Sequence, residues 1–256
     1  MSIVRRGVWV LALLLSLASG TQAQPAAPAS AAAASDPTGG LALYLAFQRD
    51  PANQFMRDGK VDAEAYRRLA ARPLQERQEQ VAAIEGLGMA AGKGNLAAGE
   101  LLARYFHETV APGNVARLGA LTSLLMRQGY RTPTLERFAR EADAIEKNAA
   151  GTKASAHSFL STYHDASVAA AAGYQSQTSG QSCNALQLHS VSAGEIEGAE
   201  YLPLKGTLVA GSYLVRGRWS EFWSFRGCRE EVPVKVDFIA DGWGGSSSRA
   251  SYNKGS

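Results

Sequence analysis

The chain has 256 residues and carries 26 lysines and arginines against 23 aspartates and glutamates. Two of the 26 basic residues, Arg5 and Arg6, precede residue 24, which leaves 24 basic residues beside all 23 acidic ones in the rest of the chain. No cluster of Lys and Arg remains there that would follow a phosphate backbone, which excludes nucleic acid as an expected partner.

The first 23 residues have the pattern of a signal peptide. A basic start at Arg5 and Arg6 is followed by an apolar run over 8–18 and by the small-residue site Thr21-Gln22-Ala23. The apolar run is shorter than the roughly 20 residues that a membrane-spanning helix needs. We therefore predict cleavage after Ala23, a mature chain without a transmembrane segment, and a periplasmic or secreted location.

Residues 24–40 are rich in Ala, Pro and Ser, with almost no charge and no large apolar side chain. Such a segment cannot bury enough surface to fold, so it is predicted to be a disordered linker.

Residues 41–173 are predicted to form a helical domain. The clearest helix follows Thr132, a capping residue, and Pro133 at the first helical position. Its apolar residues recur at helical spacing: Leu135, Phe138, Ala139, Ala142 and Ile145. Short breaks with Gly, Pro and Asn separate this helix from its neighbours, which favours a bundle or a short solenoid. No fixed repeat period is evident.

Residues 174–182 are rich in Gln, Ser, Gly and Thr and are predicted to be a hinge. From residue 183 to residue 256 the pattern changes to that of a β module, with strands expected over 185–191, 201–204 and 208–216 and a hairpin over 218–240. We expect the two sections to have separate cores and to unfold semi-independently. A bulge is expected at Gly217.

The hairpin has a register that its side chains define. If Cys228 and Arg229 form the tip, three apolar or aromatic pairs and one pair with a carboxylate share a face: Phe225 opposite Val232, Trp223 opposite Val234, Trp219 opposite Phe238, and Glu221 opposite Val236. A slip of one residue would move every one of these side chains to the other face, so this register is favoured.

Glu221 is the exception on this face, because a carboxylate between Trp219 and Trp223 is unfavourable unless it is paired or solvated. In one interpretation Glu221 reaches an arginine or a backbone amide at the edge of the core. In the other, Trp219, Glu221 and Trp223 form an exposed platform that stacks on a ligand such as a sugar ring.

The chain has two cysteines, Cys183 and Cys228. In an exported protein they are expected to form a disulfide, which would stabilise the fold by roughly 4 kcal/mol for a loop of this length. The alternative is a free nucleophilic Cys183 with His189 as its base.

No complete catalytic or metal motif is present. His107-Glu108 starts like a zinc-protease motif, but the required second histidine is replaced by Ala111. His157 and His164 are seven residues apart, about 10 Å along a helix, which is too far for a shared metal. We therefore expect neither a metal nor a cofactor.

The sequence thus predicts an α+β protein, with an N-terminal all-helical domain and a C-terminal antiparallel β module closed by one disulfide. The expected function is that of an exported, non-catalytic binding protein of the cell envelope, whose partner is another envelope protein or a glycan. The alternative function is an envelope hydrolase that acts on peptidoglycan or glycan with Glu221 as acid or base.

Overall fold

The computed structural model describes residues 38–228 and 230–253. The predicted signal peptide, 1–23, and the linker as far as residue 37 lie outside the described residues. The first described helix begins at Gly40, the last residue of the predicted linker.

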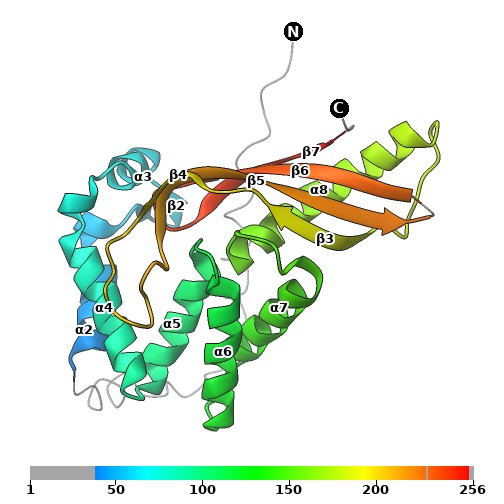
Figure 1. The fold of residues 1–256 in the computed structure, drawn as a ribbon. Helices are drawn as coiled ribbons and strands as arrows, with labels where there is room; N and C mark the ends of the chain where they lie inside the picture. Colours follow the sequence, from blue (N-terminus) through cyan, green and yellow to red (C-terminus); the bar gives the residue numbers. More distant parts are fainter. Residues whose placement is uncertain (1–37, 229, 254–256) are drawn as a thin grey trace.

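The N-terminal section is helical, as predicted (Figure 1). Its elements are α2 (Gly40–Arg49), η2 (Pro51–Asn53), the small hairpin β1 (Met56–Arg57) and β2 (Lys60–Val61), α3 (Ala63–Ala70), η3 (Leu74–Glu76), α4 (Gln78–Gly92), α5 (Leu96–Glu108), α6 (Asn114–Arg127), α7 (Pro133–Ala149) and α8 (Ala156–Gln177). Helices α4, α5, α6 and α7 each pack against the next one in the chain, and α2 packs against α4.

Helix α7 begins where the sequence predicts. The Thr132 hydroxyl accepts a hydrogen bond of 3.2 Å from the backbone N–H of Leu135, and Pro133 lies in the first turn. The predicted stripe is buried at Leu135, Phe138, Ala142 and Ile145. Capping and apolar spacing therefore act together to set this helix.

The C-terminal section is an antiparallel sheet of β3 (Gln187–Ala193), β4 (Glu197–Tyr201), β5 (Leu214–Gly227), β6 (Glu230–Ala240) and β7 (Ser246–Tyr252). The order is β3-β5-β6-β7, and β4 pairs with the first half of β5. The predicted fold class is confirmed. Gly217 lies at the irregular pairing of β4 with β5, with φ 141°, and a Cβ there would meet Ile196 at 2.7 Å.

The predicted hairpin register is confirmed in full. The pairs are Phe225 with Val232, Trp223 with Val234, Glu221 with Val236 and Trp219 with Phe238. These side chains face the helices, and all of them are buried. The alternation of period two was sufficient because only this register buries the whole apolar row.

Two of the predicted strands are confirmed only at one end: of 201–204 only Tyr201 is in a strand, and of 208–216 only residues 214–216 are. Residues 202–213 are not part of the sheet and form a loop between β4 and β5 that runs down beside the helices in Figure 1. Leu202, Val209 and Tyr213 are buried, and the Tyr213 hydroxyl accepts a hydrogen bond of 2.9 Å from the Gln80 side chain on α4. The apolar residues of this segment are therefore buried by helices and not by strand pairing.

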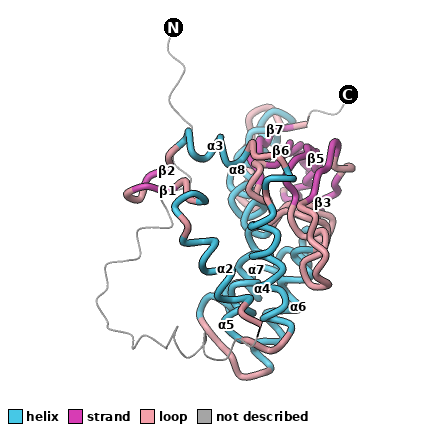
Figure 2. Tube along the Cα trace, turned by 90° about the vertical axis from the view of Figure 1, so that its left-hand side faces the viewer, coloured by secondary structure: helices cyan, strands magenta, loops and turns pink. Residues whose placement is uncertain are grey.

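The junction between the two sections also differs from the prediction. Helix α8 continues to Gln177, so the first four residues of the predicted hinge are helical, and Tyr174 is buried. Figure 2 shows α8 beside the sheet, where it packs against β5, β6 and β7. One hydrophobic cluster extends from α4 and α5 through α8 to β5 and β6. The two sections therefore share a core.

Candidate functional site

The three residues proposed as a ligand platform lie on the inner face of β5. Trp219 and Trp223 are buried, and Glu221 is 0% exposed. The expectation of an exposed platform is therefore wrong, because helix α8 and the α7–α8 loop cover this face. The Trp223 ring stacks on Phe159 of α8, with 4.7 Å between the ring centroids.

The Glu221 carboxylate accepts hydrogen bonds from five donors. Both indole N–H groups point at it, from Trp219 at 3.0 Å and from Trp223 at 2.9 Å. The other donors come from the α7–α8 loop: the Thr152 hydroxyl at 2.9 Å, the Lys153 N–H at 2.8 Å and the Ala154 N–H at 3.3 Å. The expected contact with backbone amides is present, whereas no arginine among the described residues is a partner.

This arrangement explains how a carboxylate is tolerated in the core. Burial of a charged or polar group is unfavourable unless hydrogen bonds replace its contacts with water, and five donors do so here. The two tryptophans at i−2 and i+2 are a sequence signal for it, because residues two apart share a face of a strand. The loop donors, in contrast, carry no local signal.

The predicted disulfide between Cys183 and Cys228 is present, with 6.0 Å between the Cα atoms. Cys228 has φ 50° at the tip of the β5–β6 hairpin, next to the pair Gly227 and Glu230. The bond therefore fixes the hairpin tip to the segment before β3. Neither cysteine is free to act as a nucleophile.

The opposite side of the sheet is open among the described residues, and we call it the outer face. It carries small polar, charged and apolar side chains: Ser220, Phe222 and Ser224 of β5, Pro233, Lys235, Asp237 and Ile239 of β6, and Ser247, Arg249 and Ser251 of β7. Phe222 is 44% exposed and Ile239 is 59% exposed.

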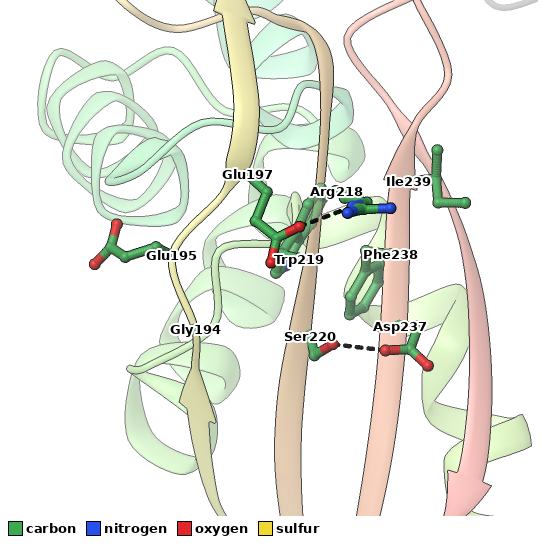
Figure 3. A pocket seen from close by; sticks show the side chains of 9 residues that line it. All are labelled: Gly194, Glu195, Glu197, Arg218, Trp219, Ser220, Asp237, Phe238 and Ile239. Atoms are coloured by element: carbon green, nitrogen blue, oxygen red, sulfur yellow. Dashed lines mark hydrogen bonds and ion pairs between the residues drawn. The ribbon is translucent and has the colours of Figure 1, made fainter.

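A cleft of about 480 Å³ lies at the end of this face where β3 gives way to β4 (Figure 3). Two pairs of its polar side chains are bonded to each other. Arg218 donates to Glu197 at 2.8 Å, and the Ser220 hydroxyl donates to Asp237 at 2.6 Å. Ile239 lies beside these pairs, so the cleft combines an apolar side chain with a charged border.

Two carboxylates on this side of the sheet, Asp237 and Glu231, have lowered pKa values. The hydrogen bonds from Lys235 and Ser220 lower the pKa of Asp237. The hydrogen bonds from Ser224 and Arg226 lower the pKa of Glu231. A general acid needs a pKa near the working pH, so neither group is suited to donate a proton to a leaving group near neutral pH.

His107, the first residue of the incomplete zinc-protease motif, is buried on α5. The His107 Nε2 lies 2.9 Å from a carboxylate oxygen of Glu141, and the ring stacks on Phe138 with 4.2 Å between centroids. Burial, together with the neighbouring charges of His157, Arg137 and Arg104, lowers the pKa of His107 to about 3. Within the part of the chain that is described, the ring has no hydrogen bond to a hydroxyl or thiol, so the pair lacks a nucleophile.

Over residues 38–228 and 230–253, no group of three or more His, Cys, Asp or Glu side chains is placed to hold a metal ion. In the same ranges, no helix combines the length and the apolar character that crossing a bilayer requires. In comparisons with known proteins, no family model, curated protein or solved structure matches the chain.

Proposed function

We propose that this chain is an exported, non-catalytic binding protein that holds another protein of the cell envelope on its outer face. The observation that carries the proposal is the exposure of Phe222 and Ile239 on a sheet face that no described element covers. Buried aromatic and aliphatic anchors within a charged border are the usual composition of a protein interface.

Export is supported by two features. The N-terminal sequence has the pattern of a signal peptide. The disulfide between Cys183 and Cys228 is of the kind that forms and persists in oxidising compartments.

A protein partner is favoured over a glycan by the chemistry of the outer face. Sugar recognition relies on hydrogen bonds to hydroxyl groups, whereas the Arg218–Glu197 and Ser220–Asp237 pairs already use much of the polar capacity beside the cleft. The exposed side chains of Phe222 and Ile239 offer apolar surface alone. Glu221, the residue on which a hydrolase would depend, is buried with five donors around it and is not accessible to a polymer.

The test uses a photo-crosslinking amino acid at position 220 in the exported protein, with and without substitution of the two anchors. Phe222→Ser and Ile239→Ser are expected to reduce crosslinking to a specific envelope protein at least tenfold. Val168→Ser is the matched control, because Val168 is 56% exposed but lies on α8, away from the outer face.

Equal crosslinking in all three variants would contradict the proposal. If instead the protein sedimented with purified peptidoglycan, and Phe222→Ser abolished this sedimentation, the outer face would bind a glycan.

A further inference from the structure

A small cavity lies where the end of α3, the start of α4 and the turn from β6 to β7 meet. Its volume is about 10 Å³, and it shares no residue with the cleft at the outer face. Five of the side chains that line it carry polar groups: Asn53, Arg72, Arg77, Gln80 and Trp243. A space of this size holds about one water-sized group. The cavity is therefore a candidate site for a ligand of a single atom.

The first cation in the wall, Arg77, is only 2% exposed. Its guanidinium donates to the backbone carbonyls of Arg72 at 3.0 Å, Gly242 at 2.8 Å and Ala70 at 2.8 Å, and at 3.4 Å to that of Leu69. A guanidinium has five N–H groups, so one N–H, on Nη1, remains. Carbonyls are neutral acceptors, so these bonds leave the buried positive charge without a counter-ion.

The second cation, Arg72, is half-buried and has weaker contacts. Its Nη1 lies 3.5 Å from the Asn53 Oδ1, which is longer than an ordinary N–H···O hydrogen bond. Burial and, after it, the positive charges of Arg72 and Arg216 lower the pKa of Arg77. The two arginines of the wall therefore repel each other, and an anion beside both would remove this repulsion.

No carboxylate lines the cavity, and among the described residues neither arginine forms an ion pair. Asp241 is adjacent in sequence to Gly242, but its Oδ1 accepts hydrogen bonds from the backbone N–H groups of Trp243 at 2.7 Å and Gly245 at 3.0 Å. Three carboxylates near the wall residues in sequence are exposed and do not line the cavity: Asp50, Glu76 and Glu79.

Trp243 adds an N–H group to this wall. Its indole N–H is buried and has no hydrogen-bond partner within 38–228 and 230–253. The ring itself is held by Phe55, with 4.9 Å between the ring centroids. A buried donor without an acceptor is unfavourable. Water would accept from these N–H groups but would also need acceptors for its own two hydrogens, whereas an anion only accepts.

We propose that this cavity binds a chloride ion, held by the guanidinium groups of Arg72 and Arg77 and by the indole N–H of Trp243. Phosphate, sulfate and carboxylates exceed the volume of the cavity, which leaves a monatomic anion. The ion connects the helical segment around α3 to the turn that joins β6 to β7. The site shares no residue with the outer face, so the inference does not depend on the proposed function.

The first test is a urea titration of the exported chain in sodium chloride and in sodium gluconate at equal ionic strength, so that screening is the same. An ion that binds only the folded state stabilises it in proportion to the logarithm of its concentration. The urea midpoint is therefore expected to rise with chloride and not with gluconate. An equal rise in sodium acetate would overturn the proposal, because the site would then not select a monatomic anion.

Arg72→Gln is expected to weaken the dependence on chloride about tenfold, the loss of one charge-assisted hydrogen bond. Trp243→Phe keeps the ring against Phe55 but removes the N–H, and it should weaken the dependence severalfold. Arg68→Gln is the matched control, because Arg68 is exposed on α3 and does not line the cavity. An unchanged response to chloride in Arg72→Gln would overturn the proposal. Far-ultraviolet dichroism in gluconate establishes that each variant is folded.

The second test locates the ion without any substitution. Crystals of the wild-type protein grown in sodium bromide should give an anomalous peak beside the guanidinium groups of Arg72 and Arg77. A water molecule there, without anomalous signal, would overturn the proposal, as would a bromide peak in a protein whose urea midpoint does not respond to chloride. If Arg72→Gln does not fold, these two measurements on the wild-type protein decide.

Discussion

The carboxylate of Glu221 on β5 accepts a hydrogen bond of 2.8 Å from the backbone N–H of Lys153, in the loop that joins α7 to α8. The loop has no strand to pair with, so this bond and those from Thr152 and Ala154 attach it to the sheet. The two indole N–H groups hold the carboxylate from the other side. Glu221 thus connects the helical section to the β section through polar contacts inside a largely apolar core.

Glu221→Gln is expected to lower the free energy of unfolding by about 2–4 kcal/mol. One carboxylate oxygen, an acceptor, would become an NH₂ group, which is a donor and would face the donors of the loop or the indoles. Both donors would then lack an acceptor. A urea titration followed by tryptophan emission measures the loss. Glu230→Gln is the control, since Glu230 is exposed on β6 and its substitution should change the free energy by less than about 0.5 kcal/mol. Equal stability of Glu221→Gln and wild type would show that the five donors contribute little.

Reduction of the Cys183–Cys228 disulfide is expected to lower the free energy of unfolding by roughly 4 kcal/mol, because the bond closes a long loop in the unfolded chain. The measurement is a urea titration of the native and the reduced protein. A variant with both cysteines replaced by serine should resemble the reduced protein and should not respond to reductant. A response of that variant would mean that the reductant acts elsewhere.

The sequence was informative where local pattern and tertiary environment agree. The register of Trp223 with Val234 could be predicted because a slip would expose the apolar row. The start of α7 could be predicted because Thr132 and Pro133 are local signals. Residues 202–213 could not, since Val209 and Tyr213 have the spacing of a strand but are buried by α4 and α5, and such long-range contacts override local propensity.

The same limit applies to the candidate site. A contact of Glu221 with a backbone amide was one of the two interpretations of the sequence. The segment that supplies the amide, Thr152–Ala154, could not be predicted, because it depends on how α7 and α8 pack against the sheet. The exposure of Phe222 and Ile239 follows from the alternation of the hairpin, because both lie out of phase with Trp223 and Phe238. The cavity between α3, α4 and the β6–β7 turn depends on tertiary packing, which the sequence does not encode locally.

Cleavage of the signal peptide is expected after Ala23. The intact mass and the N-terminal sequence of the exported protein should identify Gln24 as its first residue. Replacement of Ala23 by Arg should block cleavage, since the small-residue site would be lost. Cytoplasmic accumulation of the wild-type chain with residues 1–23 intact would contradict the prediction.

The two sections are expected to unfold in one transition, because a single hydrophobic cluster extends from the helices into the sheet and includes α8 on both sides of the predicted boundary. Tryptophan emission reports mainly on β5, and far-ultraviolet dichroism reports mainly on the helices. The two urea midpoints should coincide. Separate midpoints would show that the two sections unfold semi-independently, as the hinge predicted at 174–182 suggests.

Acid is expected to destabilise the protein through His107. Burial lowers the pKa of His107 to about 3 in the folded state, below the value near 6.5 of an unfolded histidine. A histidine whose pKa is lowered in the folded state makes its full contribution to stability above about pH 6.5. This contribution is lost as the pH falls toward 3, because the unfolded chain binds the proton at a higher pH than the folded chain does. At pH 4.5 the loss from this one residue should be about 2–3 kcal/mol relative to pH 7.

The check compares the pH dependence of wild type with that of His107→Gln, which keeps a donor for Glu141 but cannot titrate. Carboxylates with lowered pKa values, such as Asp237, also lose stability in acid, but they are present in both proteins and cancel in the difference. His164→Gln on α8 is the matched control, because His164 is exposed and its removal should leave the pH dependence unchanged. If the free energy of unfolding of His107→Gln and of wild type changed in parallel between pH 7 and pH 4.5, burial against Phe138 would not lower the pKa of His107.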